Sequence, residues 1–297
     1  MAHNHNHSHS TSVRKSNIGL AFFLNLSFTF VELIGGFLTN SVAILSDAVH
    51  DLGDSFSLAL AWYFEKLSKR GRTVRFSYGY KRFSLIGAII NSVVLIVGSI
   101  YIISEAVPRL LSPQETNAKG MLMLAVLGVV VNGVAVLRTR KTSSINERMV
   151  SLHLLEDALG WVAVLIGSVV MYFTGWTVID PILSIAIACF VLFNVYKNIH
   201  KVLPVLLQGT PADIDPVQIE RVLKALDSIS EVHDMHIWSL DEIHNILTAH
   251  IVVVGHNSME HLAMLKLEVR SVLAQEGITH ATLEFEFSGE VCGCMCN

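Results

Sequence analysis

Six long apolar stretches constrain the fold more than any other feature of the sequence. They lie at about 17–38, 41–64, 82–106, 119–138, 149–173 and 179–202. Each is near or above the ~20 residues that an α-helix needs to span a bilayer. Only 15% of the residues are charged, against about 25% in an ordinary soluble domain. The sequence therefore predicts an integral membrane protein whose membrane part is an all-α bundle of six transmembrane helices.

The connections between these stretches differ in their content of Lys and Arg. Basic residues gather before the first stretch, in the second-to-third and fourth-to-fifth connections, and at the end of the sixth stretch: Arg14, Lys15, Lys66, Lys69, Arg70, Arg72, Arg75, Lys81, Arg82, Arg138, Arg140, Lys141, Arg148, Lys197 and Lys201. The alternate connections hold only Arg109 and Lys119. The positive-inside rule therefore predicts that both termini are cytoplasmic, which agrees with an even number of spans.

Two of the apolar stretches carry a His and an Asp at the same spacing. His50 and Asp54 lie in SDAVHDLGD, and His153 and Asp157 lie in HLLEDALG. Residues four apart share one face of a helix, so two facing helices would gather two imidazoles and two carboxylates around one point. That ligand set suits a tetrahedral Zn²⁺ ion.

The cost of such residues in lipid favours a functional site. An Asp at the centre of a spanning helix costs roughly 2.5–3.5 kcal/mol. A place at the water interface, or a polar contact between helices, is the alternative. Because the same spacing occurs in two separate stretches, the sequence favours a transport site for a metal ion.

Other polar residues accompany this pattern. Asn25 and Glu32 are seven residues apart and share a helix face, so they either line a water-filled path or pack against another helix. Asp47 stands one turn before His50. We predict that Asn25, Glu32 and Asp47 line the pathway of the ion. Asp180 precedes Pro181, a pattern typical of a helix N-cap followed by the first helical residue.

The character of the sequence changes at Gln208-Gly209-Thr210-Pro211. Asp215-Pro216 predicts a helix start, 232–240 and 247–254 read as strands, 258–275 as a helix and 280–287 as a half-buried strand. This α-β-β-α-β order predicts a ferredoxin-like α+β domain. The expected division is a disordered His-rich arm at 1–16, a transmembrane domain at 17–207, a cytoplasmic domain at 208–288 and a Cys-rich tail at 289–297.

The C-terminal domain and both termini are rich in metal-ligand types. The domain holds His233, His236, His244, His250, His256, His261, His280, Glu284 and Glu286. Spacing alone does not choose a subset. The termini add His3, His5, His7 and His9, and Cys292, Cys294 and Cys296. The histidine arm suits weak metal capture, and thiolates in a cytosolic tail suit a soft cation.

Taken together, these motifs resemble the cation diffusion facilitator family of metal/proton antiporters, of the bacterial zinc-exporting type. VELIGGFLTNSVAILSDAVHDLGD is similar to the family's first-to-second span, SYGYKRFSLIGA to its third-span entry, HLLEDALGWVAVLIG to its fifth span and IDPILSI to its sixth. VHDMHIWSL resembles the start of its cytoplasmic domain. The resemblance covers nearly the whole chain.

The resemblance implies a set of site residues and partners. It implies a zinc transport site at His50, Asp54, His153 and Asp157, in a homodimer of the inner (plasma) membrane. By position, His233, His250 and His261 match cytoplasmic ligands of the family, and Glu284 and Glu286 stand where it often has a His and an Asp. Gln208 replaces an Asp that in some members pairs with a third-span Lys, so Lys81 is expected to lack that partner.

The expected function is export of Zn²⁺ from the cytoplasm coupled to proton entry, by alternating access. A metal-binding His must be neutral and an Asp ionised, so protons and Zn²⁺ compete for one site. The alternatives are export of cadmium, cobalt, manganese or iron, or a membrane metal sensor. The sequence holds no H-E-x-x-H and no G-x-x-x-x-G-K, so an enzyme or nucleotide-driven pump is not expected, and no motif suggests a nucleic-acid partner.

Overall fold

The computed structural model describes residues 11–68, 70–139, 145–241, 243–255 and 258–290, with the side chains of 11–22, 24, 58, 61–62, 65, 68, 138–139 and 145–153 outside that description. By its contacts the chain forms two compact units. One comprises Met1–Tyr63 and Gly87–Asn198, and the other Phe64–Ile86 and Ile199–Asn297.

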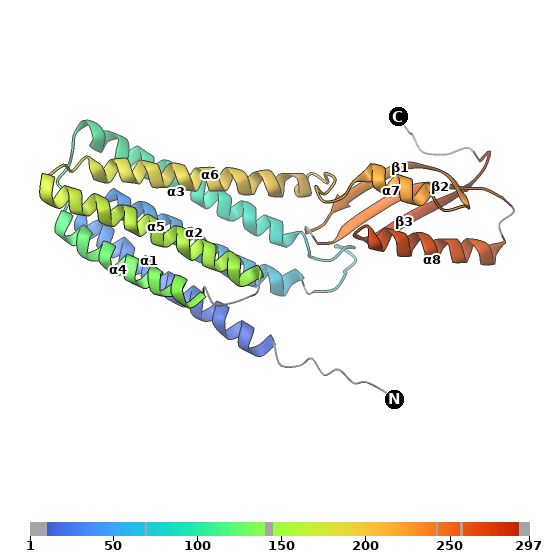
Figure 1. Ribbon diagram of the computed structural model, residues 1–297, viewed down its shortest axis with the longest axis horizontal. Helices are drawn as coiled ribbons and strands as arrows, with labels where there is room; N and C mark the ends of the chain where they lie inside the picture. Colours follow the sequence, from blue (N-terminus) through green and yellow to red (C-terminus); the bar gives the residue numbers. More distant parts are fainter. Residues whose placement is uncertain (1–10, 69, 140–144, 242, 256–257, 291–297) are drawn as a thin grey trace. The chain divides into compact units, whose positions relative to one another are not determined.

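Within the described residues, a helix covers each predicted apolar stretch (Figure 1). The bounds are α1 Thr11–Thr39, α2 Val42–Ser68, α3 Phe83–Leu111, α4 Ala118–Thr139, α5 Ile145–Thr174 and α6 Ile179–Leu206. The turns between them use residues that tolerate left-handed backbone. Asn40 between α1 and α2 has φ 53°, and Gly175 between α5 and α6 has φ 70°.

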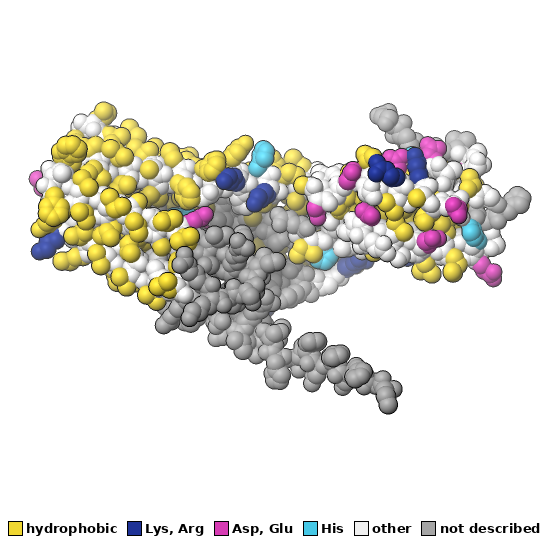
Figure 2. Space-filling model, in the orientation of Figure 1, with side chains coloured by type: hydrophobic (Ala, Val, Ile, Leu, Met, Phe, Trp, Pro, Cys, Tyr) yellow, Lys and Arg dark blue, Asp and Glu magenta, His cyan; other side chains and the backbone are white. Residues whose placement is uncertain are grey.

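In the described part of the chain, four helical segments are long and apolar enough to cross a membrane: Phe83–Leu111, Ala118–Leu137, Leu154–Thr174 and Ile179–Leu206. α1 adds a shorter apolar segment, Asn25–Thr39. α2 is interrupted by Asp47, Asp51 and Asp54, which lower its hydropathy. Large apolar side chains cover much of the helical surface (Figure 2), as expected where lipid is the solvent. The chain is therefore a membrane protein.

α2 packs between two groups of buried apolar residues. On one side Ala43 and Ile44 join residues of α4 and α5, including Trp161. On the other side Val42 joins residues of α3 and α6. Gly128 of α4 allows the closest approach, since a Cβ there would lie 2.1 Å from the Trp161 ring of α5. Small residues at helix contacts let backbones come together in membranes, so α4 and α5 pack closely at this point.

The first turn of α2 is capped by a residue of α6. The buried Asp180 carboxylate accepts hydrogen bonds from the Ser41 hydroxyl (2.6 Å), the Val42 N–H (2.8 Å) and the Ala43 N–H (3.2 Å). The first N–H groups of a helix have no intrahelical partner, and a negative charge there complements the helix dipole. The prediction that Asp180 caps its own helix is wrong, because α6 already begins at Ile179.

The C-terminal segment forms the predicted α-β-β-α-β order. Its elements are α7 Pro216–Lys224, β1 Ile229–Ser239, β2 Asn245–Val253, α8 Met259–Gln275 and β3 Ile278–Phe287. The sheet order is β1-β2-β3, with β1 and β2 antiparallel and β2 and β3 parallel. The predicted N-cap is confirmed, since the Asp215 side chain accepts a hydrogen bond from the Val217 N–H.

One apolar cluster joins both helices to the sheet. α7 contributes Ile219 and Leu223, α8 contributes Leu265, Val269 and Leu273, and β2 contributes Leu247, Ala249, Ile251 and Val253. Because side chains alternate along a strand, His250 of β2 projects from the other face of the sheet. Glu284 and Glu286 of β3 alternate in the same way with the core-packed Leu283 and Phe285. His250, Glu284 and Glu286 thus share the sheet face opposite the helices.

Candidate metal centre

Three of the four predicted transmembrane ligands come together between α2 and α5. The Nε2 atom of His50 lies 3.6 Å from the Asp54 Oδ2 atom and 3.9 Å from the Asp157 Oδ1 atom. Side-chain exposure is low, at 17% for His50, 19% for Asp54 and 7% for Asp157. The four-residue spacing on α2 accounts for the contact of His50 with Asp54. The contact of His50 with Asp157 depends on the packing of α5 beside α2.

This geometry is close to that of a zinc site. One donor atom from each of the three residues lies within 4.8 Å of the others. Donors around a tetrahedral Zn²⁺ with bonds of ~2.0 Å stand roughly 3.3 Å apart, so small side-chain movements would close the group around an ion. The fourth predicted ligand, His153, lies on α5, but its side chain is outside the described residues.

Buried acids lie near the group. Glu32 of α1 is 1% exposed and Asp47 of α2 is 5% exposed. Among the described residues, neither carboxylate oxygen of Glu32 has a hydrogen-bond partner, and the Oδ2 atom of Asp47 has none. Burying such groups without partners is costly. Asn25 is placed differently, because its amide donates to the Asp51 carbonyl oxygen and the Ser55 hydroxyl of α2, so it packs against another helix.

A second group forms on the open face of the C-terminal sheet. His233, His250 and Glu286 each offer a donor atom within 4.8 Å of the others. The Glu286 carboxylate lies 3.1 Å from the His233 Nε2 atom and 2.5 Å from the His250 Nδ1 atom. Strand pairing explains part of this geometry, because His233 pairs with His250 across β1 and β2. Glu286 pairs with Val252, two residues beyond the His250–Glu284 pair, so it reaches His250 from a diagonal position on the same sheet face. Two imidazoles and a carboxylate again fit Zn²⁺.

Hydrogen bonding changes the acidity of the carboxylate in this group. The hydrogen bond with His250 is the main cause that lowers the pKa of Glu286, and it outweighs burial, with His233 adding to the effect. A carboxyl that is readily ionised is the form that binds metal. Glu284 lies farther out, with its Oε2 atom 3.6 Å from the His250 Nε2 atom and its side chain 70% exposed.

Asp234 is a nearby acid that was not among the predicted ligands. Its Oδ1 atom lies 3.1 Å from the His236 Nε2 atom and its Oδ2 atom 3.8 Å from the His250 Nε2 atom. Its φ of 47° accompanies an irregularity of β1 between His233 and His236. The available signal was an acid between two histidines in the stretch HDMH.

The remaining predicted ligands stand apart from this group. His261 lies at the start of α8, and its Nε2 atom is 3.1 Å from the Ser228 hydroxyl. His244 is held by Asp241, with its Nδ1 atom 2.7 Å from the Asp241 Oδ1 atom. The predicted terminal ligands lie outside the described residues: His3, His5, His7, His9, Cys292, Cys294 and Cys296.

Curated relatives align with almost the whole chain. A cadmium, cobalt and zinc/H⁺-K⁺ antiporter of Bacillus velezensis is 36% identical over 290 residues, which is 96% of this chain and 92% of the relative. The metal cation efflux system protein CzcD of Cupriavidus metallidurans is 34% identical, over 92% of this chain and 86% of the relative. Zinc transporter ZitB of Escherichia coli is 31% identical, over 90% and 86%.

A family model gives the same result by a different comparison. The model that describes the cation efflux transmembrane domain matches residues 18–207. This range includes α2 and α5, which carry the four residues predicted as transmembrane ligands. The chain therefore belongs to the cation efflux family, the cation diffusion facilitators.

Proposed function

We propose that this protein exports Zn²⁺ from the cytoplasm and couples the export to proton entry. The observation that carries the proposal is the convergence of His50, Asp54 and Asp157 from two helices inside a membrane bundle. The printed names of the relatives, a zinc transporter and an antiporter for cadmium, cobalt and zinc, support the same substrate class. Cadmium, cobalt, manganese and iron are the other candidate substrates.

The proposed transport site consists of His50, Asp54, His153 and Asp157. His153 precedes Asp157 by four residues, so both occupy one face of α5. Nitrogen and oxygen donors in equal number suit a borderline ion such as Zn²⁺. A site of four protein ligands holds the ion without water, and movement of one helix away from the other would release it.

Proton coupling follows from the chemistry of these ligands. Zn²⁺ binds only to neutral imidazole and ionised carboxylate, so arrival of protons favours release of the ion. When the bundle opens to the opposite side of the membrane, the emptied ligands can take up protons for the return step. Glu32 and Asp47 are proposed to line the path, with support from their burial and from oxygens without a partner among the described residues.

The proposed architecture places this site in a six-helix transmembrane domain at 17–207. A His-rich arm at 1–16 precedes it, and a ferredoxin-like cytoplasmic domain at 208–288 and a Cys-rich tail at 289–297 follow it. The distribution of Lys and Arg supports cytoplasmic termini in the inner (plasma) membrane. The family resemblance supports a homodimer.

The cytoplasmic domain is proposed to bind regulatory metal through His233, His250 and Glu286. The close donor atoms of these three residues support this assignment. Glu284 and, at a greater distance, His261 are proposed as further contributors. The terminal histidines and cysteines are proposed as weaker ligands, on composition alone.

The test is zinc flux in proteoliposomes under a proton gradient. We expect Asp157→Ala to reduce flux by at least about tenfold, because loss of even an outer-shell partner of a metal costs 10–100-fold. Glu156→Ala is the matched control, since Glu156 is an exposed neighbour on the same helix. Wild-type protein that binds Zn²⁺ but shows no flux would favour a sensor. Equal flux in both variants would remove the site assignment.

A further inference from the structure

A basic pocket lies inside the second compact unit. It is formed by the loop between α2 and α3 and by the β1–β2 turn with the start of β3. Its volume is about 230 Å³. Five of the residues that line it carry basic side chains: Arg70, Arg72, Lys81, His244 and His280. Both segments belong to the same unit, which includes Phe64–Ile86 and Ile199–Asn297.

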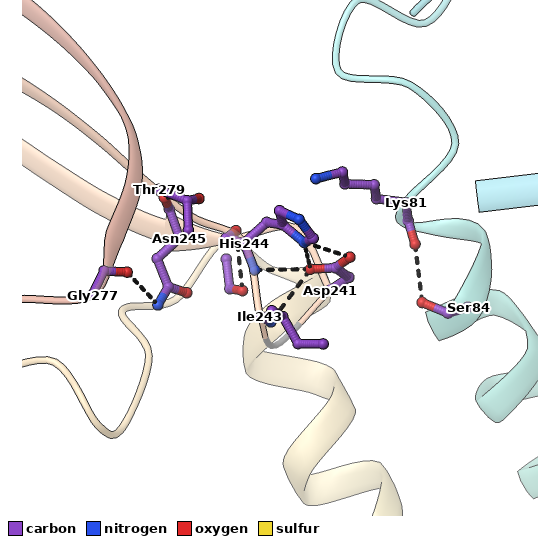
Figure 3. A network of polar contacts seen from close by, with 9 residues as sticks. Lys81, Ser84, Asp241, Ile243, His244, Asn245, Gly277 and Thr279 are labelled. Atoms are coloured by element: carbon purple, nitrogen blue, oxygen red, sulfur yellow. Dashed lines mark hydrogen bonds and ion pairs between the residues drawn. The ribbon is translucent and has the colours of Figure 1, made fainter. Parts of the chain in front are cut away.

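The charged side chains that line the basic pocket are all positive. No carboxylate is among the described residues that line it, although the chain as a whole has a net charge of -4. Asp241 is a nearby carboxylate that already contacts one of the lining residues, since its Oδ1 atom lies 2.7 Å from the His244 Nδ1 atom. It also accepts hydrogen bonds from the backbone N–H groups of His244 (2.9 Å) and Ile243 (3.3 Å). Figure 3 shows Asp241 within this turn and the Lys81 side chain extending toward the His244 ring.

The residues that line the basic pocket are held in place by ring contacts and a backbone hydrogen bond. The ring of Tyr78 meets that of His280 edge to face, with centroids 6.0 Å apart. Gly79, with φ 80°, donates a backbone hydrogen bond to the Phe76 carbonyl oxygen, and this turn brings the chain back toward Lys81. The rings of Phe76, Tyr80 and Phe83 contact one another, with Phe76 and Phe83 edge to face and the other two pairs tilted. The loop is therefore a built structure that holds its basic residues in place.

The positive-inside rule accounts for the presence of basic residues in this loop. It does not account for their position beside two histidine side chains around one pocket. The positive charges of the Arg and Lys side chains repel one another, and an anion bound between them would offset this repulsion. Arginine forms a planar fork that matches phosphate oxygens, and lysine adds a point charge. Lys81 stands two residues before α3, which is long and apolar enough to span. One wall of the pocket is thus next to the end of a helix that is long and apolar enough to span the membrane.

We propose that the basic pocket binds the phosphate group of an anionic ligand. The two possible sources are the headgroup of an anionic phospholipid and free inorganic phosphate. A water molecule occupies ~30 Å³ of liquid, so the pocket has room for a phosphate group together with several waters. Occupancy would join the loop before α3 to the β-sheet domain through a shared anion.

The experiment compares two full-length triple variants with the wild type in detergent. Arg70→Gln/Arg72→Gln/Lys81→Gln removes the charges of the pocket. Arg221→Gln/Lys224→Gln/Arg270→Gln removes the same charge from α7 and α8, away from it. Native mass spectrometry counts bound phosphatidylglycerol against phosphatidylcholine, and calorimetry measures binding of inorganic phosphate. Zinc flux of each variant, measured after reconstitution into proteoliposomes, checks that the protein is folded.

A basic residue near an anionic surface contributes about fivefold in affinity, so we expect the pocket variant to lose on the order of a hundredfold. The control should keep wild-type affinity. Loss confined to phosphatidylglycerol identifies a lipid headgroup, and loss of phosphate binding identifies the free ion. Should the triple variant misfold, Lys81→Gln alone should lose about fivefold. Equal binding of both probes by the pocket variant and the control would overturn the proposal.

Discussion

At the scale of single residues, Glu286 has an unusual position because its two oxygens face two different histidines, His233 and His250. Hydrogen bonding with His250 lowers the pKa of Glu286. A carboxyl whose pKa is lower in the folded state stabilises the fold at pH above its unfolded pKa, about 4.3. That contribution is lost as the pH falls through the lower folded pKa.

We therefore expect Glu286→Gln to lower the melting temperature near neutral pH, and this difference from the wild type to disappear at acidic pH, below the folded pKa. Zinc affinity of the same variant should fall by about 10–100-fold, as for loss of other metal-site groups. Glu284→Gln is the control, since that side chain is 70% exposed. Differential scanning fluorimetry across pH, with and without Zn²⁺, gives both readouts. A destabilisation that persists unchanged in acid would contradict the assigned role.

Residue-scale prediction from sequence succeeds where spacing alone decides the contact. His50 and Asp54 meet because they are one helical turn apart. Asp157 joins them through packing of α5 against α2, which the repeated motif indicated without fixing any distance. Asp234 was not selected, since its place beside His250 depends on an irregularity of β1 and on a positive φ. Local sequence does not reveal such a feature.

At the scale of elements, α2 depends on α6 for its cap. Removing the Asp180 carboxylate would leave the Val42 and Ala43 N–H groups and the Ser41 hydroxyl without their acceptor. We expect Asp180→Ala to cost roughly 2–4 kcal/mol, since a hydrogen bond to a charged group contributes about 1.5–3 kcal/mol and a helix cap about 1. Thermal unfolding in detergent measures the loss. Asp213→Ala, at an exposed position, should be close to neutral, and equal effects of both variants would count against the cap.

Element prediction failed at Asp180 for a physical reason. Asp followed by Pro reads as a local cap, but the donors that Asp180 serves lie in α2, far away in the sequence. The predicted strand boundaries were less far from the structure. β1 begins at Ile229 and β2 at Asn245, both earlier than predicted, because pairing between strands extends them past the strongly apolar residues.

At the scale of the whole molecule, the C-terminal core is self-contained. Its buried apolar residues all lie between Ile214 and Ile278. We expect residues 208–297 expressed alone to be folded, because domains of 55–65 residues already fold independently. A cooperative thermal transition and a dispersed NMR spectrum would establish this. A fragment ending at residue 275 lacks β3 and should be unfolded, and an aggregated longer fragment would contradict the expectation.

The membrane part was predictable at this scale because lipid imposes length and polarity on any helix that crosses it. Four described segments meet those conditions outright. α2 does not, since it carries Asp47, Asp51 and Asp54. Its helical character was nevertheless predictable from the apolar residues around the acids. The acids themselves marked the segment as functional.

The contact of Gly128 with Trp161 limits how the bundle can move. There is no room for a methyl group between them, so we expect α4 and α5 to move together rather than slide past each other. Trp161 follows Asp157 by one turn of α5, so we expect any movement of α5 that displaces the Asp157 carboxylate to carry α4 with it. We therefore expect the relative movement of helices in a transport cycle to occur at contacts other than that between α4 and α5.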